Sequence, residues 1–406
     1  MAEENRLIML PPQKSKFIRF AIEGLNSFAT ILYFNYLYFE MRARFGFSDR
    51  QNLELAAFIG LTYALVAWQV GKLAYRLGYF NTLKTGFGLM IFGLLLGAQL
   101  PFVAGQILAA SIVNIGMCLT WPVLEALVSE AETPAAMPRT LGIYNVIWAA
   151  TYALAFFIGG KLIALFGFAA TFYLPALVQI LQLALTFWLE RQVRKMPKVN
   201  LENLSFVTSQ ISEIEPHRSS PQKTKTFLRM AWLANPFAYI AINTLIAVLP
   251  GVADKFHLTT ALAGVVCSLW CFARVAAFVV LWQWPDWHYK FRWLAAAFVI
   301  LILSFVTILL TTNLAVVLLA QLFFGGAIGL IYYSSLYYSM NASDVKSEHG
   351  GIHEAVIGLG NFVGPAIGAA SLQFFPQSPH NGALAVSVLL CGGFGGLLWL
   401  RQPRKS

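Results

Sequence analysis

The chain has 406 residues, of which 58% are hydrophobic and only 11% are charged. A soluble globular domain carries about 25% charged residues, so the composition excludes an ordinary water-soluble protein and predicts a polytopic membrane protein. The formal net charge of +10 does not indicate nucleic-acid binding, because the basic residues collect in polar segments between apolar stretches, where they report membrane topology.

Twelve stretches are long and apolar enough to cross a bilayer, since a spanning helix needs roughly 20 residues. They predict an all-α polytopic fold of two pseudo-symmetric six-helix bundles, at 17–189 and 227–400. The predicted spans are, in chain order, Phe17–Phe39, Leu53–Tyr75, Thr82–Leu100, Phe102–Glu125, Arg139–Ile163, Phe168–Leu189, Phe227–Leu249, Leu258–Trp282, Trp293–Thr311, Ala315–Tyr338, Gly350–Phe375 and Ala383–Leu400.

Three polar segments lie outside the predicted bundles: tails at 1–16 and 401–406, and a linker at 190–226. The linker is charged, contains Pro and Ser, and lacks an apolar period, which predicts a cytoplasmic connection. If the N-terminus lies inside, most of the 28 Lys and Arg residues fall in cytoplasmic segments. The positive-inside rule therefore predicts a plasma-membrane protein with both termini in the cytoplasm.

No motif for catalysis or for a cofactor stands out. The chain has no phosphate-binding loop, no zinc-spaced His and Cys cluster and no nucleophile elbow. All four cysteines (Cys118, Cys267, Cys271 and Cys391) fall in predicted spans, so no disulfide framework is indicated. We expect no cofactor, no metal and no enzymatic activity.

The two halves are related by one constant offset along the chain. The same shift lays Asn26 on Asn235, Gly142 on Gly351 and Ile158 on Ile367. A shared offset near both ends of a half indicates an internal duplication. Under this pairing Asn145 corresponds to Glu354, and Tyr152 corresponds to Asn361.

Two motifs add to the topology. Gly71, Lys72, Arg76 and Gly78 lie between the second and third spans in a glycine-bounded basic loop, with Tyr75 directly before Arg76. The eleventh span carries Gly360, Gly364, Pro365 and Gly368.

With these features the chain resembles the major facilitator superfamily. The resemblance implies alternating access around a cavity built mainly by the first, fourth, seventh and tenth spans, and a gating role for Lys72 and Arg76 through acids such as Glu125 or Glu130. We expect a monomer whose partners are a small-molecule substrate, the lipid bilayer and, as a candidate coupling ion, the proton.

Charged side chains within spans are candidates for coupling or gating, because such groups are expensive in a bilayer and mark functional paths. The set comprises Glu354, His353, Arg274, Glu23 and Glu125. Glu354 could carry protons or form a gate hydrogen bond at the helix mouth, and His353 is more simply a packing residue. Arg274 needs an anionic partner, most simply Glu354 or a group on the substrate, and a permanent structural ion pair is the alternative.

Amides and hydroxyls at helical spacing predict a polar cavity near the midplane. The candidates are Asn26, Thr30, Tyr33, Asn145, Tyr152, Asn235, Tyr239, Asn243, Tyr333, Tyr337 and Asn361. Any one amide could instead join neighbouring helices, and tyrosines near a span end could form an aromatic belt.

These features favour a secondary active transporter for a small polar or amphipathic organic solute, with proton coupling as a hypothesis. The alternative is a non-transporting membrane sensor or scaffold derived from a transporter. Such a protein would be expected to lose the polar stripes, which this sequence retains.

Overall fold

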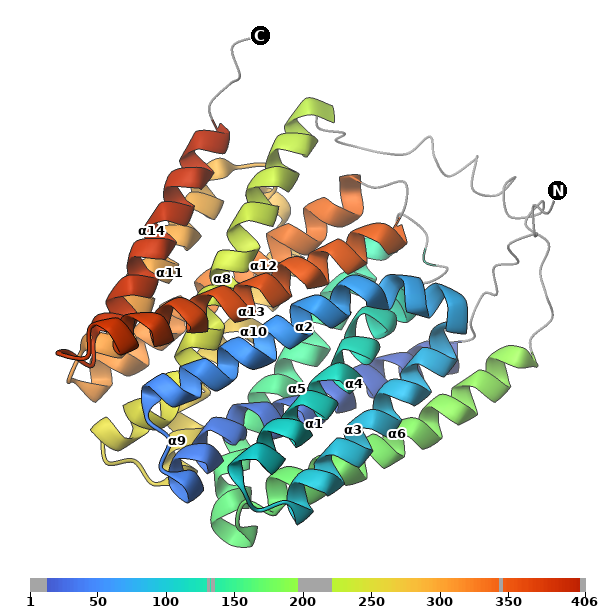
Figure 1. Ribbon diagram of the computed structural model, residues 1–406. Helices are drawn as coiled ribbons and strands as arrows, with labels where there is room; N and C mark the ends of the chain where they lie inside the picture. Colours follow the sequence, from blue (N-terminus) through green and yellow to red (C-terminus); the bar gives the residue numbers. More distant parts are fainter. Residues whose placement is uncertain (1–12, 130–131, 133–135, 196–220, 343–345, 402–406) are drawn as a thin grey trace.

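The computed structural model describes residues 13–129, 132, 136–195, 221–342 and 346–401. All regular secondary structure in these residues is helical, as the apolar periodicity predicts. The helices form one bundle in which the two halves of the chain pack side by side (Figure 1).

The described residues of the first half form six helices. Gly78 separates the second from the third with a φ of 77°, and Gly167 ends the fifth with a φ of 69°. Residues with a β-carbon rarely adopt this left-handed backbone. The positive φ therefore explains why the last residue of the basic loop motif is a glycine. The helices are α1 (Gln13–Phe45), α2 (Asp49–Leu77), α3 (Tyr79–Gln99), α4 (Val103–Ser129), α5 (Met137–Phe166) and α6 (Ala170–Arg194).

The second half repeats this plan with one interruption. The predicted span Leu258–Trp282 is not a single helix, because it breaks at Ser268, whose hydroxyl donates to the Val265 carbonyl at 3.0 Å. The elements are α8 (Pro221–Lys255), α9 (Thr260–Cys267), α10 (Leu269–Gln283), the 3₁₀ turn η1 (Pro285–Trp287), α11 (Phe291–Leu310), α12 (Leu314–Ala342), α13 (Lys346–Phe374) and α14 (Asn381–Arg401).

The helices differ from the predicted spans mainly in length and polarity. Within the described residues, 11 segments are long and apolar enough to cross a membrane, with α9 and α10 counted as one, and α1 is not among them. Helix α1 has 33 residues, but it carries Arg19, Glu23 and Asn26, all buried inside the protein. Helix α6 continues to Arg194 and α8 begins at Pro221, so helices extend into both ends of the predicted linker at 190–226.

The outer helices of the two halves lie on opposite flanks. Helices α3 and α6 pack together on one side of the bundle, and α11 and α14 pack together on the other (Figure 1). Their outward faces expose large apolar side chains, including Leu177, Leu303 and Val388. Such faces suit contact with lipid rather than water.

The most extensive contacts between the halves are those of α2 with α13 and of α5 with α9 and α10, and α8 also touches α1 and α2. Backbones approach closely in both contacts. A β-carbon added to Gly60 would overlap the backbone of Asn361 on α13, and one added to Gly160 would overlap the Thr260 carbonyl. Glycine is therefore required where the two bundles touch.

The glycines of α13 also fix its position within the second half. A β-carbon at Gly360 would lie 2.5 Å from the Pro236 carbonyl oxygen, and one at Gly364 would lie 2.6 Å from the Ile240 carbonyl oxygen, both on α8. The small-residue ladder therefore allows close helix packing, as is usual for small residues in membrane proteins.

Candidate functional site

Arg274 of α10 lies at the contact between the halves and is only 3% exposed. Its guanidinium carbon lies 4.6 Å from the ring centroid of Trp148 and 4.4 Å from that of Tyr152, both on α5. The Trp270 ring, one turn away on its own helix, lies 5.0 Å from it. The cation is thus held by aromatic faces from both halves, each such contact contributing about 0.5–2 kcal/mol.

Glu354 of α13 bonds across the other contact between the halves. Its side chain is 7% exposed and accepts a hydrogen bond from the Tyr63 hydroxyl of α2 at 2.5 Å. The predicted ion pair between Glu354 and Arg274 is absent from the described residues. In this conformation the two charges have separate neighbours, because α13 packs against α2 while α10 packs against α5. The other partner that the sequence left open for Arg274 is an anionic group on the substrate.

Two further acids share the region of Glu354. Glu23 of α1 is fully buried, and Tyr144 of α5 lies close enough to its carboxyl group to interact with it. Glu125 of α4 and Glu354 both lie close enough to Glu23 to interact with it electrostatically. Carboxyl groups inside a membrane protein are candidate proton carriers, and here they come from both halves.

Aromatic rings fill the space near these charges. The Trp148 ring lies 6.1 Å from Trp121 of α4, 5.6 Å from Phe278 of α10 and 5.3 Å from Tyr332 of α12, between ring centroids. The candidate residues from the sequence did not include Trp148, Trp270, Tyr63 or Tyr332. Trp148 and Trp270 could have been identified from the sequence, because both fall in the middle of a predicted span, whereas tryptophans of membrane proteins usually lie at the interfaces.

Several predicted cavity amides bond within one half of the protein. Asn243 donates to Asn361 at 2.6 Å, which joins α8 to α13, and Asn145 accepts from the Trp148 indole at 3.1 Å. Asn26 accepts from Thr120 at 3.4 Å. Asn235 is different, because its buried amide has no partner for either atom among the described residues.

The predicted hydroxyl groups separate into central and peripheral sets. Tyr152 contacts Arg274 directly, and the Tyr239 ring lies 6.4 Å from that of Tyr332. The Thr30 hydroxyl donates to the Asn26 carbonyl of its own helix, and Tyr33 packs edge-on against Phe172 of α6. Tyr152 therefore lies between the halves, and Tyr239 of α8 is near enough to Tyr152 and Glu125 of the first half to interact with them electrostatically. Thr30 and Tyr33 instead make their contacts within the first half.

The tyrosines at the end of α12 pack against the turn that follows α10. Tyr333 lies edge-on to Trp287 of η1, and Tyr337 stacks on the His288 imidazole at 3.9 Å between centroids. This arrangement resembles an aromatic belt more than a substrate site. His353 belongs to α13, but its side chain lies outside the described residues.

A family model described as Major Facilitator Superfamily matches residues 20–369 of the chain. The chain belongs to this superfamily. The match spans most of both halves, in agreement with the repeat and the paired six-helix plan.

Solved structures of superfamily transporters share the fold at low sequence identity. The human organic anion transporter MFSD10 (TETRAN) superposes with a TM-score of 0.68 at 14% identity, covering 97% of this chain and 100% of its own. The nucleoside transporter NupG gives 0.67 at 12%, covering 96% and 100%. A mutant of the peptide transporter POT in complex with alafosfalin gives 0.68 at 16%, covering 95% and 93%. No curated protein sequence matches this chain significantly.

The basic loop motif of the superfamily lies at the end of α2. Within the described residues neither Lys72 nor Arg76 forms an ion pair. Both side chains are exposed, and nothing lies within 4 Å of a β-carbon built on Gly71. Glu130, an acid near the predicted partner Glu125, lies outside the described residues.

A charged latch joins the halves at the end of the bundle remote from both termini. Arg42 at the end of α1 contacts Asp49 of α2 at 2.8 Å and Asp254 of α8 at 2.5 Å, in both cases between nitrogen and oxygen. All three side chains are partly exposed, so each pair contributes modestly, about 0–1 kcal/mol. The sequence did not predict this latch, because its members lie near three separate helix ends.

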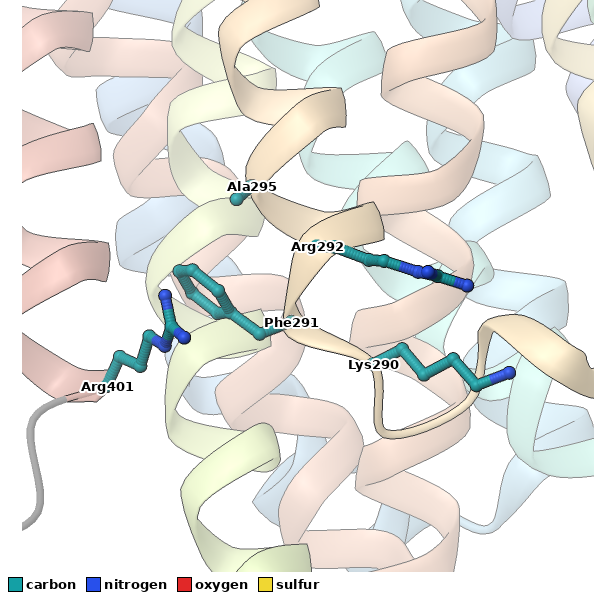
Figure 2. A pocket seen from close by; sticks show the side chains of 5 residues that line it. All are labelled: Lys290, Phe291, Arg292, Ala295 and Arg401. Atoms are coloured by element: carbon teal, nitrogen blue, oxygen red, sulfur yellow. The ribbon is translucent and has the colours of Figure 1, made fainter.

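A basic hollow of about 650 Å³ lies apart from the contact between the halves (Figure 2). It is found where α11 begins and α14 ends, and the Arg401 guanidinium carbon lies 4.5 Å from the Phe291 ring centroid there. The lining residues are Lys290, Phe291, Arg292, Ala295 and Arg401. The hollow belongs to the second half alone, so it is not the site that both halves build.

We expect the stability of the protein to depend on pH through His288, which lies between the spans formed by α10 and α11. Burial lowers the pKa of His288 from 6.5 to about 4. Between these pH values the unfolded chain binds a proton that the folded chain does not, so stability falls as the pH is lowered through this window. We expect His288→Phe to flatten that fall in the thermal unfolding midpoint of the purified protein. The exposed His380, replaced in the same way, is the control and should leave the profile unchanged.

Proposed function

We propose that this chain is a secondary active transporter that moves a small organic solute by rocker-switch alternating access. The observation that carries the proposal is the pair of contacts between the halves, each with an ionisable side chain buried beside it. Arg274 lies at the contact of α5 with α10, and Glu354 lies at the contact of α2 with α13. Rocking of two rigid halves would open and close the space between them.

The end of the bundle remote from the termini is closed in this conformation, which supports the same mechanism. The latch of Arg42 with Asp254 and the close approach of Gly160 to Thr260 both lie at that end. We propose that this end faces outside the cell and that both termini lie in the cytoplasm, because the positive-inside rule favours that orientation. The transporter is proposed to act as a monomer in the plasma membrane.

Proton coupling through Glu354 is the second part of the proposal. The residue can hold a proton, and its hydrogen-bond partner Tyr63 belongs to the other half, so movement of the halves would change its surroundings. His353, Glu23 and Glu125 remain coupling candidates beside it, with Asn235, Tyr239 and Tyr152 as candidate solute contacts.

Membership of the superfamily does not identify the solute that this chain transports. The three similar structures are titled as transporters of organic anions, nucleosides and peptides, and each shares the fold at less than 25% identity. A choice among solutes therefore has to come from the side chains of this chain.

The test is solute flux into proteoliposomes that contain the purified protein, measured across a panel of anionic, neutral and cationic organic compounds with and without a pH gradient. We expect saturable uptake of at least one class, stimulated by the gradient. A complete absence of protein-dependent flux across the panel would favour the alternative of a non-transporting sensor or scaffold.

A further inference from the structure

The strongest unexplained feature of the molecule is the electrostatic state of Arg274. Its side chain is nearly fully buried, yet no carboxylate lies within ion-pair distance among the described residues. The nearest candidate from the sequence, Glu354, is bonded to Tyr63 instead. A buried charge without a counter-charge is strongly unfavourable, so the site is incomplete as it stands.

The aromatic rings around Arg274 satisfy only part of its chemistry. The faces of Trp148, Tyr152 and Trp270 attract the positive charge. Nε and Nη2 nevertheless both lack a hydrogen-bond partner among the described residues.

The two unpartnered nitrogens are the important detail. Nε and Nη2 form one edge of the guanidinium, and their N–H groups point the same way with the spacing of two carboxylate oxygens. An edge left open in this manner matches one planar oxyanion bound through two parallel hydrogen bonds. A single cation also matches a single negative charge better than a dianion.

We propose that Arg274 binds the carboxylate of the transported solute, and that this solute is a small organic monoanion with an apolar or aromatic body. The proposal rests on the proposed transport function and names the solute class for the same site. The carboxylate would bond to Nε and Nη2, while the rings that hold Arg274 and the neighbouring Tyr332 and Phe278 would contact the body of the solute.

The same geometry would link binding of the anion to the relative position of the two halves. Arg274 comes from the second half, whereas Trp148 and Tyr152 come from the first. A solute seated on the guanidinium edge would touch both halves at once, so its binding would depend on how they are rocked. Neutralising the buried charge would also lower the electrostatic penalty of closing the site around it.

The test uses the purified full-length protein and three matched probes: benzoate, benzamide and benzylamine. Binding is followed by quenching of tryptophan fluorescence, since Trp148 and Trp270 lie beside the site, and by competition with a radiolabelled carboxylate. We expect the wild type to prefer benzoate over benzamide by about tenfold or more, as a charge-assisted bidentate pair allows.

Two variants separate charge from geometry. Arg274→Gln should reduce the affinity for benzoate far more than the affinity for benzamide, so that the preference for the carboxylate is lost. Arg274→Lys keeps the charge but loses the two-pronged edge, so it should retain an intermediate affinity. Arg292→Gln is the control, because it removes one positive charge at the separate hollow shown in Figure 2. This variant should bind benzoate like the wild type.

Thermal unfolding of each variant shows whether it folds. If Arg274→Gln does not fold, the binding of the probes to Arg274→Lys decides the test. The inference is overturned if wild-type protein binds none of the probes saturably, if it binds benzoate no better than benzamide, or if both Arg274 variants keep the wild-type preference. Flux of neutral or cationic compounds without flux of carboxylates would overturn the inference and leave the proposed transport function standing.

Discussion

Replacement of Glu354 by glutamine is expected to abolish accumulation of solute driven by a pH gradient while leaving solute exchange across the membrane. Glutamine has the shape of glutamate and can still bond to the Tyr63 hydroxyl of α2, but it cannot take up and release a proton. Solute binding and rocking would therefore continue, and only their link to the proton would be lost. The loss should be large, about tenfold or more in gradient-driven uptake, because the coupling free energy disappears with the carrier.

The measurement compares uptake into proteoliposomes under an imposed pH gradient with exchange of labelled for unlabelled solute. Glu190→Gln is the control, since this acid of α6 is held by Lys84 at 3.0 Å and Arg194 at 2.8 Å, on the outer side of the first half. If Glu354→Gln keeps the gradient dependence of the wild type, Glu354 is not the coupling residue. Glu23 and Glu125 would then be replaced in the same way.

The helices could be predicted from the sequence because hydrophobic length is a local property. The repeat that lays Asn26 on Asn235, with the basic linker, also indicated two halves before any contact was known. The break at Ser268 was not predicted, because the apolar residues continue through it without a proline or glycine. The hydrogen bond from the Ser268 hydroxyl to the Val265 carbonyl lies at this break.

The buried charges could be predicted from the sequence, but the side chains that surround them could not. Arg274 and Glu354 could be identified because charge inside a span is conspicuous. Their partners could not, because opposite charge alone suggested that they pair with each other. The actual neighbours, Tyr63 for the acid and Trp148 with Tyr152 for the cation, depend on which helices of the two halves touch.

The amides illustrate the same limit in another way. Asn243 and Asn361 have the composition of a solute site, yet they bond to each other and join α8 to α13. The pattern of one helix shows which face is polar, and only the packing shows whether that face meets a cavity or another helix. Asn235, which has no partner among the described residues, is the amide that still suits a solute contact.

Cross-linking the halves at the end remote from the termini is expected to stop transport completely and reversibly. Leu53 begins the contact of α2 with α13, and a β-carbon built on Gly368 lies 3.3 Å from its Cδ1. This spacing is tight, but the near atom is the end of the Leu53 side chain, which Leu53→Cys removes, so cysteines at both positions fit and can be bridged by a short bifunctional methanethiosulfonate. The background carries Cys391→Ser, since Cys391 is the exposed cysteine while the other three are buried.

The expected result follows from the rocker-switch itself: this end cannot open unless α2 and α13 separate, so the bridge holds one conformation and flux falls to background. A thiol reductant should restore it. The matched control pairs the same Gly368→Cys with Val386→Cys of α14, whose Cγ2 lies 3.7 Å from the built β-carbon. That bridge lies within the second half, which moves as one body, so it should leave flux unchanged. Undiminished flux through the Leu53–Gly368 bridge would mean that the halves do not separate there, and the rocker-switch would have to be abandoned.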